Sequence, residues 1–426
     1  MRRWRTDAAA LRLAAALLFV AAFGAATKAY GDPRPAIASA FSADGLKRVS
    51  DYFANEVATG KIPGAVVLIQ QHGKPVYFET FGFRDPVAHA PMTKDAIFRL
   101  YSMSKPITSV AVMMLVDDGK IAVSDPLSKY IPAFADVKVA VVTGHLVGKP
   151  TLEFEPLRRP ITIEDLLRQT SGITYGFYGD TAVRKLYAGS DLFEGGLDNA
   201  QFVERLAKLP LADQPGTLWD YGHSTDVLGR VVEVVTGKSL YQFEKERLLD
   251  PLGMSDTAFS VPEAQRARVA AFLPNDRFER PVAGVGDSVL PPRWQSGGAG
   301  MVGSASDYAR FAEMLLESGS LDGKRYLKPE TVRLMTSDHI GKETKVARDD
   351  YYFPGGDNGF GLGFAVRTVA TGPLPVGEYR WNGVGGTIFF VDPRDDMLTV
   401  VMMQSPSQRA RIEEEARKLI YEALGK

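Results

Sequence analysis

The hydrophobic and polar positions at the start of the chain predict a helix followed by a β-hairpin. Apolar residues recur three or four positions apart in residues 40–61, which is typical of an amphipathic helix. Residues 64–70 and 76–83 are rich in Val, Ile, Tyr and Phe, and the polar stretch 71–74 separates them. Two such runs around a short loop that contains glycine are typical of paired antiparallel strands.

A short apolar strand at residues 97–100 leads into a second predicted helix at 102–118. Pro106 would break the interior of a helix, but it is tolerated in the first turn, where its missing N–H is not needed. We therefore expect Ser102 at the start of this helix. Because side chains three positions apart share a helix face, Lys105 is expected beside Ser102.

The middle of the chain, from about residue 131 to 289, has a different pattern of short helices and loops. One helix is expected at 162–169, where the first residues have the spacing of a capping box. Another is expected at 224–235, and it should end at Gly237 because glycine readily adopts the left-handed conformation that closes a helix.

Beyond Gly297 the pattern returns to helices and strands like those at the start. The expected elements are a helix at 306–317, strands at 387–391 and 397–403, and a final helix at 407–424. Strands near both ends of the chain predict a single sheet that is built from N- and C-terminal segments.

The predicted fold class is α+β, an antiparallel sheet flanked by helices with a mostly helical lobe inserted. A cleft between such lobes is a common place for an active site. The expected sheet lobe covers about residues 40–130 and 290–426, and the expected helical lobe covers about residues 131–289.

The first residues have the pattern of an export signal. Four arginines within the first twelve residues precede an uncharged apolar run at 13–26, and small residues follow it. We expect residues 1–29 to be a signal peptide that is cut after Ala26 or Ala29. Residues 30–426 would then be a periplasmic or secreted protein, and an uncleaved N-terminal anchor is the alternative.

The composition narrows the possible chemistry. The chain has 426 residues, 45% hydrophobic and 24% charged, which suffices for a large core, and it contains no cysteine. Disulfides, cysteine-bound metals and a thiol nucleophile are therefore excluded. The net charge is −1, and without residues 1–29 it is −5, because 45 basic and 50 acidic residues remain. Since there is no long basic run, nucleic acid is a poor partner.

The stretch Tyr101-Ser102-Met103-Ser104-Lys105 is the strongest chemical signal in the chain. A serine hydroxyl needs a base to become a nucleophile, and a buried lysine with a lowered pKa can supply one. A helix N-terminus also presents backbone N–H groups that can stabilise an oxyanion. Short patterns of this kind also arise by chance, so the context decides.

Two blocks further along the chain supply that context. Tyr221 lies in a loop just before a predicted helix, and residues 380–387, Arg-Trp-Asn-Gly-Val-Gly-Gly-Thr, lead into a strand. Ser-x-x-Lys, then a tyrosine loop, then a glycine on a strand is the order of motifs in serine penicillin-recognising enzymes. From about residue 40 to 420 the chain resembles the class C β-lactamase and DD-peptidase superfamily, and within it the family VIII carboxylesterases. Further matching blocks lie at residues 166–177, 226–229, 251–254 and 297–301.

The resemblance implies a β-lactamase/transpeptidase-like fold and a role for each matching residue. Ser102 would be the acylated nucleophile, Lys105 would share its proton, and Tyr221 would act as the general base. The backbone N–H groups of Ser102 and Val384 would form the oxyanion hole. No metal and no organic cofactor takes part in this chemistry. The residues expected to bind the substrate are Tyr175, His223, Trp381, Asn382 and Gly383.

Two departures from the superfamily's pattern favour an ester over a β-lactam as the substrate. Trp381 and Asn382 stand where Lys and Thr usually meet the carboxylate of a β-lactam, so the expected cation is missing. His223 stands where the tyrosine loop usually has Asn, and a neutral imidazole can partly replace the amide. We therefore expect an exported serine hydrolase of small carboxylic esters. Its partner would be a small-molecule ester or amide, without stable membrane insertion after signal cleavage.

The same residues leave other activities open. A β-lactamase, a D-amino-acid peptidase or other amide hydrolase, and an acyltransferase share this machinery, and the acyltransferase differs only in the acyl acceptor. A protein that captures penicillin-like or peptidoglycan-like ligands without turnover is an alternative of another class. A nucleophile elbow at Ser224 is disfavoured, because that motif needs glycine where Asp226 stands.

Overall fold

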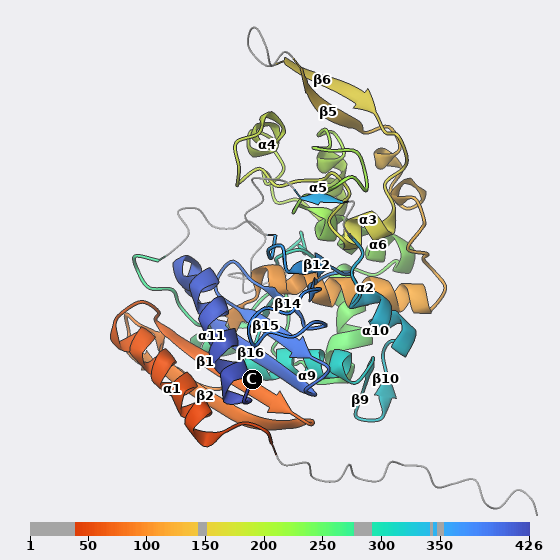
Figure 1. Ribbon diagram of the computed structural model, residues 1–426. Coiled ribbons are helices and arrows are strands. Elements are labelled where there is room, and N and C mark those ends of the chain that lie inside the picture. The colour runs from red at the N-terminus through yellow and green to blue at the C-terminus, as the bar shows by residue number, and fades with distance from the viewer. Residues whose placement is uncertain (1–38, 144–150, 277–291, 341–343, 347–352) are drawn as a thin grey trace, which may run out of the picture. The chain divides into compact units, whose positions relative to one another are not determined.

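The computed structural model describes residues 39–143, 151–276, 292–340, 344–346 and 353–426 (Figure 1). Residues 40–426 form one compact unit. The expected signal peptide at residues 1–29 lies outside the described part of the chain. No helix within the described residues is both long enough and apolar enough to cross a membrane.

An eight-stranded sheet joins the two ends of this compact unit. Its strand order is β12-β13-β14-β15-β16-β1-β2-β3, so the N-terminal hairpin lies beside the C-terminal strands. Every pair of neighbours in it is antiparallel, which confirms the predicted sheet. The strands are β1 (Gly64–Gln71), β2 (Lys74–Asp85), β3 (Ala90–Pro91), β12 (Asn358–Phe360), β13 (Ala365–Arg367), β14 (Tyr379–Asn382), β15 (Ile388–Asp392) and β16 (Met397–Met403).

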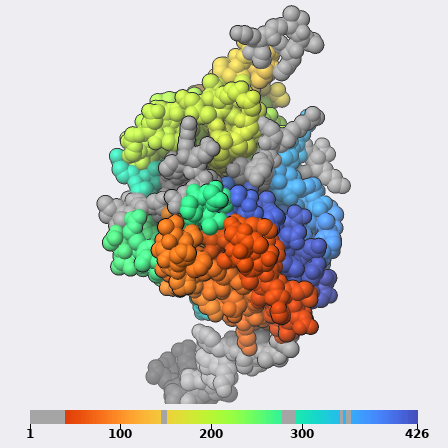
Figure 2. All heavy atoms as spheres, turned by 90° about the vertical axis from the view of Figure 1, so that its left-hand side faces the viewer, coloured from red at the N-terminus to blue at the C-terminus, as the bar shows by residue number. Residues whose placement is uncertain are grey.

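Helices cover both faces of the sheet. Because successive side chains of a strand point to opposite faces, β1 contributes Val67 to one apolar cluster and Leu68 to another. On the first face, α1 (Ala43–Ala58) and α11 (Arg409–Ala423) pack against each other and against Val67. On the other face, α9 (Ala305–Leu316) contacts β1, β15 and β16. Figure 2 shows the same closeness of the two chain ends, since red N-terminal residues adjoin blue C-terminal ones.

Helix α2 (Ser104–Asp117) connects the sheet side of the unit to the helical lobe (Figure 1). Its residues from Ser104 to Leu115 are all buried, and it contacts α6 (Ser224–Thr236) and α7 (Leu240–Glu244). Helix α6 ends at Gly237 in the left-handed conformation, as predicted. The predicted capping box is also present at the start of α3. The other helices of the lobe are α3 (Ile163–Leu167), α4 (Ala182–Ala188), α5 (Asn199–Leu206) and α8 (Asp250–Leu252), and α10 (Pro329–Met335) follows α9 along the chain.

The helical lobe also contains a hairpin that the pattern of residues did not predict. Strands β5 (Lys138–Thr143) and β6 (Thr151–Pro156) pair with each other, and β6 is largely exposed. A strand with so little burial carries a weak hydrophobic pattern. The remaining short strands form pairs: β4 (Phe98–Arg99) with β8 (Val302–Gly303), β7 (Leu218–Trp219) with β11 (Lys345–Val346), and β9 (Ser320–Leu321) with β10 (Lys324–Arg325).

Short helical turns complete the described chain. They are η1 (Tyr101–Met103), η2 (Leu127–Lys129), η3 (Pro132–Phe134), η4 (Lys245–Leu249), η5 (Glu263–Arg268) and η6 (Pro406–Gln408). The first of these, η1, lies between β4 and α2 and carries Ser102. The turn η4 extends α7 with a wider π-helical turn toward α8.

Candidate active site

Ser102 lies on the turn η1 rather than in the α-helix that follows it. The α-helix begins at Ser104, two residues later than the sequence predicts. Tyr101, the first residue of η1, has a left-handed φ of 48°, which does not fit a regular α-helix at that position. Lys105 occupies the first turn of α2, and its Nζ lies 3.4 Å from Ser102 Oγ. The two side chains therefore meet as predicted.

The ammonium group of Lys105 is removed from solvent and held by neutral groups. The side chain is 1% exposed, and Nζ donates hydrogen bonds to Tyr175 Oη at 3.0 Å and to the Gly298 carbonyl at 2.8 Å. It also lies 4.5 Å from the centre of the Tyr221 ring. Burial lowers the pKa of Lys105 to about 7, and the negative charge of Asp226 opposes this shift. Lys105 can thus exchange a proton near neutral pH.

Tyr221 is placed by a tight loop between β7 and α6. The Gly222 N–H donates to Gln169 Oε1 at 3.2 Å, and the Asp220 N–H donates to the Gln169 carbonyl at 3.0 Å. A Cβ on Gly222 would lie 2.1 Å from the Ile173 carbonyl oxygen, so only glycine fits there. These contacts fix the backbone on both sides of Tyr221, which is 1% exposed.

Strand β14 brings Trp381 to Tyr221 and turns Asn382 away from it. Trp381 Nε1 lies 3.3 Å from Tyr221 Oη, to which it donates. Because neighbouring strand residues point to opposite faces, Asn382 faces α11. There its amide donates to Glu413 at 2.7 Å and accepts from Arg409 at 2.6 Å. The structure does not bring the Asn382 side chain to Ser102, so its predicted role in substrate binding has no support from its position.

The turn after β14 packs directly against the chain segment that carries Ser102. A Cβ on Gly383 would lie 2.1 Å from the Leu100 carbonyl, and one on Gly385 would lie 2.5 Å from the Tyr101 ring. The Thr387 hydroxyl donates to the Leu100 carbonyl at 3.1 Å. Between these glycines, the Val384 N–H has no acceptor among the described residues. This packing is compatible with the predicted oxyanion hole, which stays a prediction.

His223 and Asp226 form a buried pair beside Lys105. His223 Nδ1 lies 2.8 Å from Asp226 Oδ2. Burial alone would raise the pKa of Asp226, but the hydrogen bond and charge of His223, together with Lys105, lower it overall. An ionised carboxylate can only accept hydrogen bonds, so Nδ1 of His223 carries a hydrogen and donates it to Asp226. Nε2 is the second ring nitrogen that can form a hydrogen bond. The Tyr175 ring packs edge-on against His223 at 4.4 Å.

Sequence reasoning did not identify Asp226 as part of the site. Asp226 accepts from Ser296 Oγ at 2.5 Å and from the Gly298 N–H at 3.1 Å, so it also fixes the segment that holds Lys105. Its signals in the sequence are its position three residues after His223, on the same helix face, and the matching block at 226–229. The contacts to residues 296 and 298 span about seventy positions of the chain and leave no local pattern.

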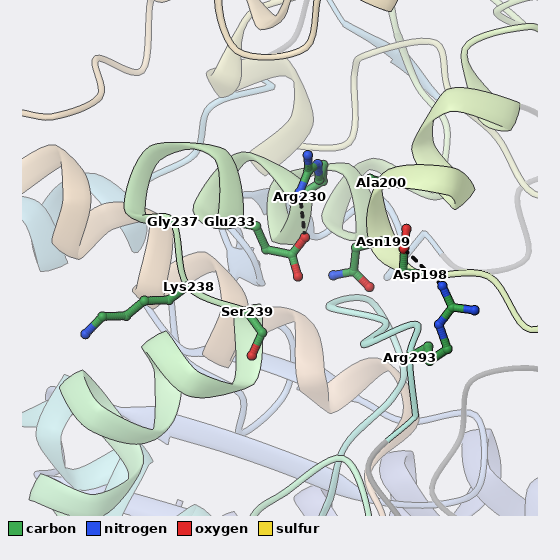
Figure 3. Close-up of a pocket in the computed structure, with 9 residues that line it drawn as sticks. All are labelled: Asp198, Asn199, Ala200, Arg230, Glu233, Gly237, Lys238, Ser239 and Arg293. Carbon is green, nitrogen blue, oxygen red and sulfur yellow. Dashed lines mark hydrogen bonds and ion pairs between the residues drawn. The ribbon is translucent and has the colours of Figure 1, made fainter.

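A separate pocket of about 440 Å³ lies between α5, α6 and α7 (Figure 3). Four of its charged side chains are paired with one another, Arg230 with Glu233 and Arg293 with Asp198, and Lys238 is paired with Glu246 outside the lining. None of the residues that line it belongs to the group around Ser102. Within the described ranges, no cluster of three or more His, Asp or Glu side chains is placed to hold a metal ion.

Comparison with known proteins gives consistent findings. The Beta-lactamase family matches residues 49–422 of the chain. Protein Rv1367c of Mycobacterium tuberculosis is 37% identical over 358 residues, which cover 81% of this chain and 86% of that protein. Esterase EstB of Burkholderia gladioli is 31% identical over 385 residues, which cover 83% of this chain and 90% of the esterase.

A solved structure supports the same relationship at the level of the fold. The protein described as "EstCE1, a hydrolase with promiscuous acyltransferase activity" superposes with a TM-score of 0.71 and 27% identity. The match covers 88% of this chain and 98% of EstCE1. The antiparallel sheet with its flanking helices is therefore an arrangement that this chain shares with a known hydrolase.

Proposed function

The chain belongs to the Beta-lactamase family and is a serine hydrolase, and from this premise we propose that it cleaves small carboxylic esters through an acyl-enzyme on Ser102. The observation that carries the proposal is the environment of Lys105. Its amine lies 3.4 Å from Ser102 Oγ, is fully buried, and has a pKa lowered to about 7. A lysine in this state can accept a proton from the serine at neutral pH.

In the proposed acylation step, Ser102 Oγ attacks the ester carbonyl carbon while its proton passes to the Lys105–Tyr221 pair. The carbonyl oxygen becomes an oxyanion, which the N–H groups of Ser102 and Val384 would stabilise. Tyr221 then gives the proton to the leaving alkoxide, and the C–O bond breaks. The acyl group remains on Ser102, and the alcohol departs.

In the second step, water attacks the acyl-enzyme and restores Ser102. Tyr221 again accepts and returns the proton, since it lies beside Lys105 and receives a hydrogen bond from Trp381. An alcohol in place of water would give acyl transfer with the same residues. EstCE1, whose description names both reactions, shows that a protein of this fold can perform both.

A neutral ester suits the site better than a β-lactam carboxylate. Trp381 occupies the strand position next to Tyr221, and its indole is neutral. Lys105, whose Nζ lies 3.4 Å from Ser102 Oγ, is used as a base in the proposed mechanism rather than as a partner for a substrate carboxylate. His223 offers Nε2, and Tyr175 adds an aromatic surface beside it. We also propose that the protein is exported after removal of residues 1–29, on the evidence of their sequence pattern alone.

The decisive experiment compares wild type with Ser102→Ala on p-nitrophenyl butyrate and on nitrocefin. We expect rapid ester cleavage by wild type, slow or no nitrocefin turnover, and a loss on the order of a thousandfold or more in the variant. Ser104→Ala is the matched control, since Ser104 lies in the same motif but accepts a hydrogen bond from Met301 N–H.

Three results would contradict parts of this proposal. Activity that survives in Ser102→Ala means that another residue is the nucleophile. Rapid nitrocefin turnover assigns the protein to the β-lactamases. A long-lived acyl adduct on Ser102, seen by mass spectrometry of the intact protein after a penicillin is added, with no ester turnover, indicates a ligand-capturing sensor.

A further inference from the structure

Glu244 is a buried carboxyl group without a charged partner. It ends helix α7, and its side chain is 0% exposed. Its contact is with α2, where Glu244 Oε1 lies 3.0 Å from Thr108 Oγ1, and no described residue gives Oε2 a hydrogen bond. No described basic side chain lies within ion-pair distance of it. An ionised carboxylate in this position would be costly, because desolvation is not offset by an opposite charge.

Counting hydrogens at Thr108 shows which form of Glu244 fits the structure. Thr108 Oγ1 lies 3.0 Å from Glu244 Oε1 and 3.1 Å from the Gly297 carbonyl oxygen. If Glu244 were a carboxylate, both neighbours would only accept, and the hydroxyl has a single hydrogen to give. If Glu244 is protonated, its O–H donates to Thr108, and Thr108 donates to Gly297. Only the protonated form satisfies both contacts at once.

The chain of hydrogen bonds ends at the Gly297–Gly298 peptide unit, which directly precedes the carbonyl that holds Lys105. The Gly297 carbonyl accepts from Thr108, and the Gly298 N–H of the same peptide plane donates to Asp226 at 3.1 Å. Both polar atoms of this plane are therefore fixed. The next carbonyl, that of Gly298, accepts the 2.8 Å hydrogen bond from Lys105 Nζ. A Cβ on Gly297 would lie 2.8 Å from the Thr225 carbonyl, so the plane is also confined sterically.

We propose that Glu244 is a positioning residue for the active site: its proton, relayed by Thr108, orients the Gly297–Gly298 peptide and thereby the acceptor of Lys105. The inference rests on the proposed role of Lys105 as a base. It adds that the site works only while a carboxyl group on the far side of α2 stays protonated.

This arrangement makes activity sensitive to alkaline pH. Burial raises the pKa of Glu244 to about 8, and the hydrogen bond with Thr108 opposes the shift only in part. On its own helical segment, Tyr241 has a pKa raised by burial and by the charge of Glu244, and exposed Lys245 has a pKa raised by its pairing with Asp250. On α2, one turn before Thr108, the pKa of Lys105 is lower than that of Glu244, at about 7. Above about pH 8, Glu244 becomes a carboxylate, Thr108 turns its hydrogen toward it, and Gly297 loses its donor.

Glu244→Gln tests the proposal because glutamine is neutral at every pH and its amide can still donate to Thr108. At pH 7 we expect the kcat of this variant for p-nitrophenyl butyrate to stay within about threefold of wild type. The kcat of wild type should fall above about pH 8, and that of the variant should not. Thr108→Val should lower kcat by about tenfold with little change in KM, and Thr108→Ser, which keeps the hydroxyl, should restore it.

The same fall above pH 8 in wild type and in Glu244→Gln would overturn the proposal, as would full activity of Thr108→Val. A second measurement does not depend on activity or on the variant folding well. The infrared absorption of protonated carboxyl groups in the wild-type protein should decrease with a midpoint near pH 8. Asp213, Asp307 and Asp392, whose pKa values burial raises to about 6, would titrate at lower pH and serve as an internal reference.

The two measurements also separate this inference from the proposed function. If Ser102→Ala remained active while the infrared band titrated near pH 8, the nucleophile would be wrong and the protonated state of Glu244 right. If Ser102→Ala were inactive and no carboxyl band titrated above pH 7, the esterase proposal would stand and the role of Glu244 would be refuted.

Discussion

Buried polar groups lie on both faces of strand β14, but those on one face have charged partners and those on the other have neutral partners. On the face toward α11, Glu378 just before the strand, Arg380 and Asn382 point to charged partners. Arg417 pairs with Glu378, and Arg380 lies 3.2 Å from Glu413. On the other face, Trp381 donates to Tyr221, which covers Lys105. There the described residues offer Lys105 no carboxylate within ion-pair distance.

This difference shows that partners, rather than burial alone, decide what a buried charge does. Arg380 and Lys105 are both almost fully buried. Burial lowers the pKa of Arg380 as well, but a guanidinium with carboxylate neighbours stays charged and links β14 to α11. Lys105 has neutral hydrogen-bond partners, and its pKa falls to about 7. The α11 face is therefore suited to stability, and the Tyr221 face is suited to proton transfer.

Removal of the amine should give the largest effect on activity. Lys105→Met keeps an apolar chain of similar length, and we expect kcat/KM for p-nitrophenyl butyrate to fall by about a thousandfold or more because the base is lost. The activity of wild type should rise as the pH passes about 7, where Lys105 loses its proton. The residual activity of the variant should not show this rise. A variant with the wild-type profile would exclude Lys105 as the titrating group.

The same variant should report on stability with a defined sign. Folded Lys105 loses its proton near pH 7, whereas the unfolded chain keeps it up to about 10.5. Between these values the unfolded state binds one more proton at Lys105, so the contribution of Lys105 to the free energy of unfolding rises with pH. Lys105→Met lacks this contribution. Urea unfolding at pH 7 and pH 9 should therefore show a smaller rise for the variant than for wild type.

The opposite pattern is expected on the α11 face. Glu378→Gln removes a negative charge that lies 4.0 Å from Arg380 and contacts Arg417, and it leaves two buried guanidiniums without this carboxylate. We expect the free energy of unfolding to fall by about 3 kcal/mol, because removing one partner of a buried ion pair leaves the other charge buried and uncompensated. The kcat of the folded fraction should stay close to that of wild type. A large loss of kcat without loss of stability would show that the two faces are coupled.

The elements that the sequence predicted well are those with strong periodicity. Strands β1, β2, β15 and β16 lie where alternation and β-branched residues place them, and α6 ends at its glycine. The Ser-x-x-Lys motif and the tyrosine loop predicted that Ser102, Lys105 and Tyr221 lie close together, and the structure has Lys105 in contact with both of the others. Local patterns of this kind depend on neighbouring residues only, so they can be read without the fold.

The parts that could not be predicted depend on contacts between distant segments. Alternation implies that Trp381 and Asn382 face opposite ways, but it does not say which of them faces the site. The contact of Lys105 with Gly298 joins positions 193 residues apart, and that of Thr108 with Glu244 joins positions 136 apart. Such pairs have no signature in one sequence, because each partner looks like an ordinary helix or loop residue.

The smallest expected effects come from substitutions of the neighbours Trp381 and Asn382. Because these residues point to opposite faces of β14, they test the difference between the two faces at adjacent positions. Trp381→Phe keeps the aromatic surface but removes the hydrogen bond to Tyr221, so we expect kcat for p-nitrophenyl butyrate to fall by about tenfold with stability nearly unchanged. Asn382→Ala removes two hydrogen bonds to α11 and should lower the free energy of unfolding by about 1–2 kcal/mol.

For Asn382→Ala, kcat and KM should both stay within about twofold of wild type, since its side chain does not face Tyr221. Kinetics and urea unfolding of the two variants side by side would show whether effects on activity and on stability separate at adjacent positions. If Asn382→Ala raised KM severalfold while its unfolding curve matched wild type, the amide would contact the substrate after all. The orientation of Asn382 toward Glu413 would then not be the one that operates during turnover.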